Sequence, residues 1–79
     1  MTRADYEALQ ARERGLTVAE MVARGFHSAK SREEPGGWQC FAVPPDLDPR
    51  EAAGVLRDFA GLEPRPFGAP APRSGGGDA

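Results

Sequence analysis

The stretch EPGGWQCFAV, residues 34–43, decides the fold of this chain. The ring of Pro35 fixes its φ angle, and Gly36 tolerates a positive φ. Residues 34–37 therefore predict a type II turn. The other six are rich in aromatic residues and predict a strand that ends before Pro44. A turn that leads directly into a strand indicates a β-hairpin, with the segment 26–33 as the other strand.

The register expected for this hairpin is symmetric about Pro35 and Gly36, which places Phe41 opposite Lys30. Because side chains alternate between the two faces of a strand, one face would contribute to the core with Phe26, Phe41 and Val43. The opposite face would carry Trp38, Cys40 and Ala42. The composition of residues 26–33 is poor for a strand, so strand, helix and loop all stay open there. Core and surface positions both stay open for Trp38.

Two helices are expected before the hairpin, each with its own capping signal. Thr2 can accept a hydrogen bond from an amide of the first turn, which predicts a helix over residues 3–14. Thr17 and Glu20 have the spacing of a capping box and predict a short helix over residues 18–24. Glycines at positions 15 and 25 end the two helices.

A third helix is expected after the hairpin. Asp48 caps it, Pro49 takes the first helical position, where a missing amide costs nothing, and Glu51 completes a capping box. Apolar residues then recur at helical spacing: Ala52, Val55, Leu56 and Phe59. The sequence thus predicts a small α+β domain over residues 2–62, in the order helix, short helix, β-hairpin, helix.

The remaining stretch, EPRPFGAPAPRSGGGDA, is predicted to be a disordered Pro/Gly-rich tail over residues 63–79. Proline removes amide donors, glycine adds backbone entropy, and one phenylalanine buries too little surface to offset the cost of ordering. A domain of some sixty residues is marginally stable alone. Good helix packing or self-association as a homodimer is therefore expected to supplement its core.

Enzymatic activity is not expected, and neither is a metal or cofactor site. The chain has one cysteine, Cys40, and one histidine, His27, too few for a Cys/His metal cluster. In the expected register, His27 lies opposite Pro44, which is about 13 Å from Cys40 along the strand. A domain of this size also has little room for the water-poor pocket that acid–base catalysis by carboxylates needs.

The charge of −2 is unevenly distributed. Residues 33–63 hold two basic and seven acidic side chains, which gives this block a charge of −5. Such a block argues against broad contact with nucleic acid and suits a basic protein surface. No apolar stretch reaches the ~18 residues of a membrane span. A lone free cysteine suits a reducing compartment, so a cytoplasmic location is expected.

Residues 17–34 also resemble a helix-turn-helix motif, which would imply an all-α fold and a small DNA-binding regulator. The positions that match the pattern are Thr17, Glu20 and Met21. Val22 departs from it, because a small alanine is usual there, and Gly25 comes one residue early. The recognition helix would have Ala29 as its one apolar residue. This reading is the alternative to a protein-binding module.

Protein binding is the function that the sequence favours, and two features are candidates for the interface. Trp38 is the only tryptophan and lies beside a tight turn, a common setting for an interface anchor. The acidic candidates surround the third helix and the turn: Glu33, Glu34, Asp46, Asp58 and Glu63.

In chain length and acidity the profile resembles small phage- or prophage-encoded inhibitors of the anti-CRISPR type. The acidic run that carries the resemblance is Glu33, Glu34, Asp46, Asp48, Glu51, Asp58 and Glu63. The resemblance implies a non-enzymatic protein that occludes a nucleic-acid-binding effector, such as a CRISPR-Cas complex. No motif accompanies it, so it assigns no functional residues. The arginines of the first two helices depart from a uniformly acidic mimic of DNA.

Overall fold

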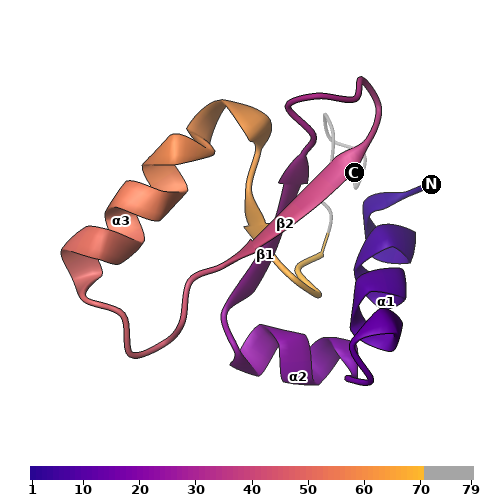
Figure 1. Cartoon of the computed structure of the whole chain (residues 1–79), viewed down its shortest axis with the longest axis horizontal. Helices are drawn as coiled ribbons and strands as arrows, with labels where there is room; N and C mark the ends of the chain where they lie inside the picture. Colours follow the sequence, from indigo (N-terminus) through magenta and orange to yellow (C-terminus); the bar gives the residue numbers. More distant parts are fainter. Residues whose placement is uncertain (71–79) are drawn as a thin grey trace, which may run out of the picture.

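Three α-helices and a three-stranded antiparallel sheet make up residues 1–70, the part of the chain that the computed structural model describes. In chain order the elements are α1 (Arg3–Glu13), α2 (Val18–Ala23), β1 (Phe26–Lys30), β2 (Trp38–Ala42), α3 (Pro49–Asp58), the 3-10 helix η1 (Ala60–Leu62) and β3 (Arg65–Pro66). The sheet has the order β2-β1-β3, with α1 and α2 on one side and α3 on the other (Figure 1). The predicted α+β class and the predicted order of the helices and the hairpin are confirmed.

The first two helices begin where their capping residues predict. The Thr2 hydroxyl accepts a hydrogen bond from the Asp5 amide at 3.1 Å, and α1 starts at the next residue. At α2, Glu20 donates its amide to the Thr17 hydroxyl and its carboxylate accepts from the Thr17 amide, so the predicted capping box is complete. Both caps satisfy amides that have no partner within the helix.

At α3 the cap is confirmed and the capping box is wrong. Asp48 accepts a hydrogen bond from the Arg50 amide at 2.8 Å, and Pro49 occupies the first turn. Since the Asp48 carboxylate bonds two residues ahead, it does not form the three-residue link with Glu51 that a capping box requires.

The hairpin forms, but its predicted register is wrong. The expected type II turn is present: Gly36 has φ +80°, and the Gly37 amide donates to the Glu34 carbonyl at 2.8 Å. Ahead of that turn, the Ser31 hydroxyl accepts from the amides of Glu33 and Glu34 at 3.1 and 3.0 Å. These bonds add residues to the loop between the end of β1 and the turn. The centre of the hairpin therefore lies before Pro35 and Gly36.

The observed register pairs Lys30 with Trp38 and His27 with Phe41, three residues away from the expected partner of Phe41. An odd shift exchanges the two faces of a strand. Trp38 and Cys40 therefore lie on the side of α1 and α2, where Cys40 packs against the core, whereas Phe41 points toward α3.

The predicted disordered tail is wrong for residues 63–70. Phe67 is 1% exposed and forms the hydrophobic core with Ala11 and Met21. Its amide donates to the Phe26 carbonyl at 3.0 Å, next to the two-residue strand β3 that pairs with β1. Proline is tolerated there because β3 is an edge strand. The predicted domain boundary after residue 62 is too early, and residues 71–79 lie outside the described part of the chain.

The helix-turn-helix alternative is also wrong. The segment that would form the recognition helix is β1, the central strand of the sheet. Ala29, the one apolar residue of that segment, is fully buried in it.

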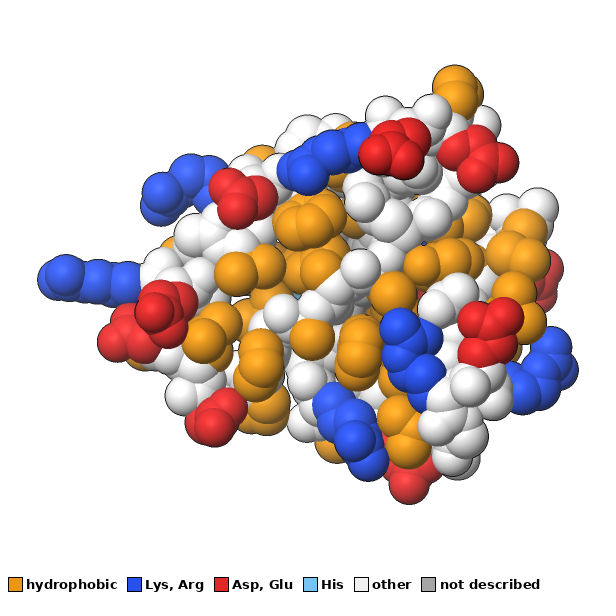
Figure 2. All heavy atoms as spheres, viewed as in Figure 1, with side chains coloured by type: hydrophobic (Ala, Val, Ile, Leu, Met, Phe, Trp, Pro, Cys, Tyr) orange, Lys and Arg blue, Asp and Glu red, His pale blue; other side chains and the backbone are white. Residues whose placement is uncertain are grey.

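α3 is attached to the sheet by a stack of rings rather than by a buried core. Phe59 follows its last residue and stacks on Phe41, with 3.9 Å between ring centroids, and the Arg32 guanidinium lies 4.7 Å from the Phe59 ring. His27 extends the stack on Phe41 at 5.3 Å. No residue within α3 is fully buried, and apolar side chains are visible at the surface between α3 and the sheet (Figure 2).

Candidate protein-binding site at the hairpin end

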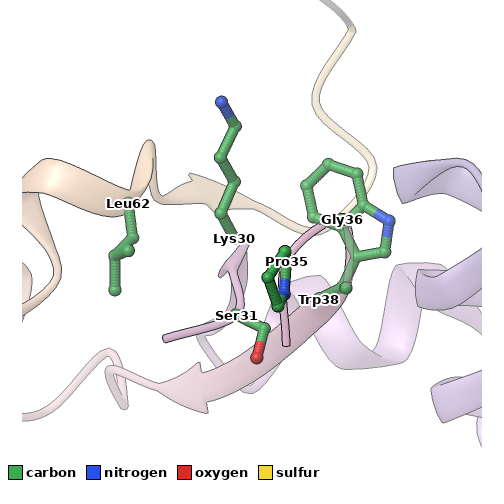
Figure 3. Close-up of a pocket in the computed structure, with 7 residues that line it drawn as sticks. Lys30, Ser31, Pro35, Gly36, Trp38 and Leu62 are labelled. Atoms are coloured by element: carbon green, nitrogen blue, oxygen red, sulfur yellow. The ribbon is translucent and has the colours of Figure 1, made fainter. Parts of the chain in front are cut away.

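A pocket of about 350 Å³ opens where the hairpin turn, the end of β1 and η1 meet (Figure 3). Its apolar side chains are Pro35, Trp38 and Leu62, and its polar ones belong to Lys30 and Ser31. The backbone of Gly36 and Gly37 supplies the rest of the lining. A volume of this size, with an aromatic and an aliphatic wall, suits an inserted side chain or a small organic group.

Trp38 is held in place from the side of α1. The Arg3 guanidinium lies 4.6 Å from the indole ring centroid, and the indole Nε1–H donates to the Met1 carbonyl at 3.0 Å. Trp38 is half-buried and still lines the pocket. The indole is thus a fixed wall rather than a free surface group, which lowers the entropy cost of binding against it.

An ion pair lies at the rim of the pocket. Lys30 Nζ is 3.0 Å from one carboxylate oxygen of Glu63, and Arg65 approaches the other at 3.9 Å. The hydrogen bond from Lys30 is the main cause that lowers the pKa of Glu63. Lys30 and Glu63 each keep 54% of their side chain exposed. The pair therefore leaves little net charge at the mouth of the pocket.

A buried polar network is centred on Glu7, Ser28 and Arg3. Glu7, 5% exposed, accepts hydrogen bonds from the Ser28 hydroxyl at 2.5 Å and from the Gly68 amide at 3.0 Å. Arg3 donates to the Ser28 carbonyl at 2.9 Å and to the Glu63 carbonyl at 3.1 Å. Buried charges are tolerated when they are hydrogen-bonded in this way. The network joins α1, β1 and the segment after η1.

Most of the predicted interface residues meet at this end of the molecule. Glu33 and Glu34 lie exposed in the hairpin loop, and no ion pair within residues 1–70 neutralises them. Arg32 donates to the Asp58 carbonyl and so ties the end of α3 to the same loop. Asp46 lies apart, because it precedes the other end of α3, a helix about 15 Å long.

The sequence missed several residues of the pocket, among them Leu62, Lys30 and Ser31. Leu62 reaches the pocket from η1, and the three-residue error in register hid that Lys30 lies beside Trp38. One signal was present: a serine three residues before the Glu34–Pro35 turn can bond the amides between them and lengthen the loop.

His27 and Cys40 lie on opposite faces of the sheet. His27 Nδ1–H donates to the Gly25 carbonyl at 3.0 Å, and its ring stacks on Phe41. Cys40 contacts Tyr6, whose pKa is raised mainly by burial and then by a hydrogen bond to Cys40. The expected separation along one strand came from the wrong register, but alternation still keeps the two side chains apart.

Within residues 1–70, no three side chains of the His, Cys, Asp and Glu types gather in a way that would hold a metal ion. No helix among these residues is long and apolar enough to cross a membrane.

A comparison with known proteins found no family model, no curated relative and no solved structure that matches this chain.

Proposed function

We propose that this chain is a non-enzymatic protein-binding module, which receives an apolar or aromatic side chain of its partner in the Trp38 pocket. The observation that carries the proposal is the pocket itself, an apolar recess beside two unneutralised carboxylates, Glu33 and Glu34. Interface anchors are characteristically side chains that fill such recesses while polar groups surround them.

The charges around the pocket favour a basic partner. Lys30 is paired with Glu63, and Arg32 keeps its charge while it lies against Phe59 and donates to the Asp58 carbonyl. Glu33 and Glu34 together outweigh Arg32, so these three loop residues carry a net negative charge. Opposite charges steer association and select partners. The partner segment that fits is an apolar side chain flanked by lysine or arginine.

A basic surface of this kind is what nucleic-acid-binding proteins present. The proposed role thus includes a phage-type inhibitor that occludes a nucleic-acid-binding effector, such as a CRISPR-Cas complex. We place this role in the cytoplasm, because Cys40 is a free thiol next to Tyr6 and suits a reducing compartment.

The test is affinity capture from a lysate of the source cells with three matched forms of the full chain as bait. They are the unmodified chain, Glu33→Gln/Glu34→Gln, and Asp46→Asn/Glu51→Gln as the control. Both double variants remove two exposed carboxylates, and the control removes them near the start of α3 instead of at the hairpin.

The proposal expects a protein that the unmodified chain and the control retain and that the hairpin variant loses. Added salt should release it, because opposed exposed charges are screened. If both double variants retain the same proteins as the unmodified chain, the hairpin end is not the binding site.

A further inference from the structure

The two edges of the sheet differ in how they are protected against pairing. β3 is two residues long and consists of an arginine and a proline. β2 is five residues long, with the sequence WQCFA, and has no charged residue and no proline. Exposed edges in natural proteins are normally blunted by charges, prolines or short length. One edge of this sheet is blunted and the other is not.

The outward backbone groups of β2 follow from its pairing with β1. The Val43 amide donates to the Gly25 carbonyl and the Ser31 amide donates to the Gly37 carbonyl, so odd-numbered residues of β2 bond to β1. Since these bonds alternate along an antiparallel strand, the amides and carbonyls of Trp38, Cys40 and Ala42 point away from β1. In Figure 1, β2 lies in front of β1 and no helix crosses it.

We propose that two copies of this chain pair through β2, antiparallel and centred on Cys40, so that the two sheets become one. This is an isologous contact, the commonest kind in homodimers. In this pairing Cys40 faces its own copy, and Trp38 lies opposite the partner's Ala42. A large side chain thus meets a small one on the same face.

The sequence around β2 is uncharged and symmetric about the same centre. Residues 35–45 contain no charged side chain, and Cys40 is their midpoint. A copy laid antiparallel on this stretch therefore meets no charge along the paired strand. Glu34 and Asp46 flank it at either end, so two carboxylates of the same sign approach at each end of the dimer.

This arrangement predicts the sign of the salt effect. Because the flanking charges are alike, added salt screens their repulsion and strengthens the dimer. Capture of a basic partner at the hairpin end has the opposite dependence. The two proposals can therefore fail independently of each other.

Sedimentation equilibrium of the full chain over the micromolar to millimolar range tests the dimer. Two substitutions at the edge, Ala42→Glu and Ala42→Pro, are each expected to yield a monomer. Ala42 is exposed and its amide points away from β1, so neither change removes a bond of the hairpin. Ala53→Glu adds the same charge at an exposed position of α3 and is expected to remain a dimer.

Amide hydrogen exchange tests whether the β2 edge is the surface that pairs in the dimer. The Cys40 amide is expected to exchange more slowly as the protein concentration rises, whereas the Phe41 amide, bonded to β1, is protected at every concentration. The proposal is overturned by a chain that stays monomeric over the whole range or by a dimer that survives both changes at Ala42. A dimer whose Cys40 amide gains no protection also overturns it.

Discussion

Gly25 connects α2 to β1 at a point where no side chain fits. Its φ is +83°, and a Cβ atom there would lie 1.9 Å from the Val43 carbonyl oxygen. The Gly25 carbonyl accepts from the Val43 amide at 2.8 Å, so the close approach is the first rung of the hairpin. Gly15 also has a positive φ, +70°, but nothing lies within 4 Å of the Cβ position.

This contrast predicts different costs for two alanine substitutions. Gly15→Ala should lose roughly 1–2 kcal/mol of unfolding free energy, the usual cost of a left-handed backbone for an L-residue. Gly25→Ala should lose about 1–3 kcal/mol more, because the backbone must move to relieve the clash. Urea denaturation of both variants measures the difference, and equal losses would contradict the geometry.

Tyr6 makes the stability of the fold sensitive to alkaline pH. Burial and the hydrogen bond to Cys40 raise its pKa above the ordinary value of 10.0, so the fold favours the neutral phenol. The unfolded chain releases the phenol proton near pH 10. Above that pH the folded chain still binds this proton and the unfolded chain does not. Stability is therefore complete below that pH and decreases as the pH rises above it.

Tyr6→Phe should remove most of this alkaline loss. Melting temperatures measured between about pH 9 and pH 11, on either side of the ordinary tyrosine pKa, should decrease less for the variant than for the unmodified chain. A variant with the same pH slope would show that Tyr6 is not the group responsible.

At the scale of elements, the two sides of the sheet are packed to different degrees. On the side of α1 and α2, Phe67 is buried with Met21 and Ala11. On the other side, α3 depends on Phe59 and its stack with Phe41 and Arg32. Regions with few buried contacts open at low free energy, so α3 is expected to be the most easily detached helix.

Alanine substitutions at the two phenylalanines distinguish these roles. Phe67→Ala should lose ~3–5 kcal/mol and lower the stability of the whole domain. Phe59→Ala removes an aromatic pair worth ~0.5–1.5 kcal/mol and should accelerate amide exchange mainly in α3. Exchange measured residue by residue would contradict this account if Phe59→Ala accelerated α1 and β1 as strongly as α3.

The helices were predictable from the sequence because their signals are local. Thr2, Thr17 and Asp48 each cap the helix that follows them. The hairpin register was predicted wrongly, because the symmetric turn expected about Pro35 and Gly36 left out the bonds from the Ser31 hydroxyl to two amides of the loop. β3 was missed for a nonlocal reason. One phenylalanine among prolines is ordered only by a cavity that α1, α2 and the sheet create together.

The candidate site also combines features that local sequence predicts with features that depend on the tertiary fold. Trp38, Glu33 and Glu34 could be proposed from the sequence, since the turn beside them is a local feature. The pocket could not, because Leu62 reaches it from η1 through the tertiary fold. Asp46, predicted on charge alone, lies at the other end of α3.

At the scale of the whole molecule, the pocket and the unpaired carboxylates lie at the same end, the end of the hairpin. The pocket, the free carboxylates of Glu33 and Glu34, and the end of α3 lie together there. The uncharged edge of β2 runs away from this end along the sheet. The two proposals thus assign a basic partner to the pocket and a second copy to the β2 edge, and Trp38 belongs to both surfaces.

Since Trp38 is the only tryptophan, 5-fluorotryptophan incorporated into the chain reports on the pocket alone through its ¹⁹F resonance. The captured protein, produced without the label, is added to the labelled chain and to its Glu33→Gln/Glu34→Gln form. The account predicts that the resonance shifts in the unmodified chain and that much more partner is needed to shift it in the variant. A partner that binds the unmodified chain and leaves the Trp38 resonance unchanged would contradict it.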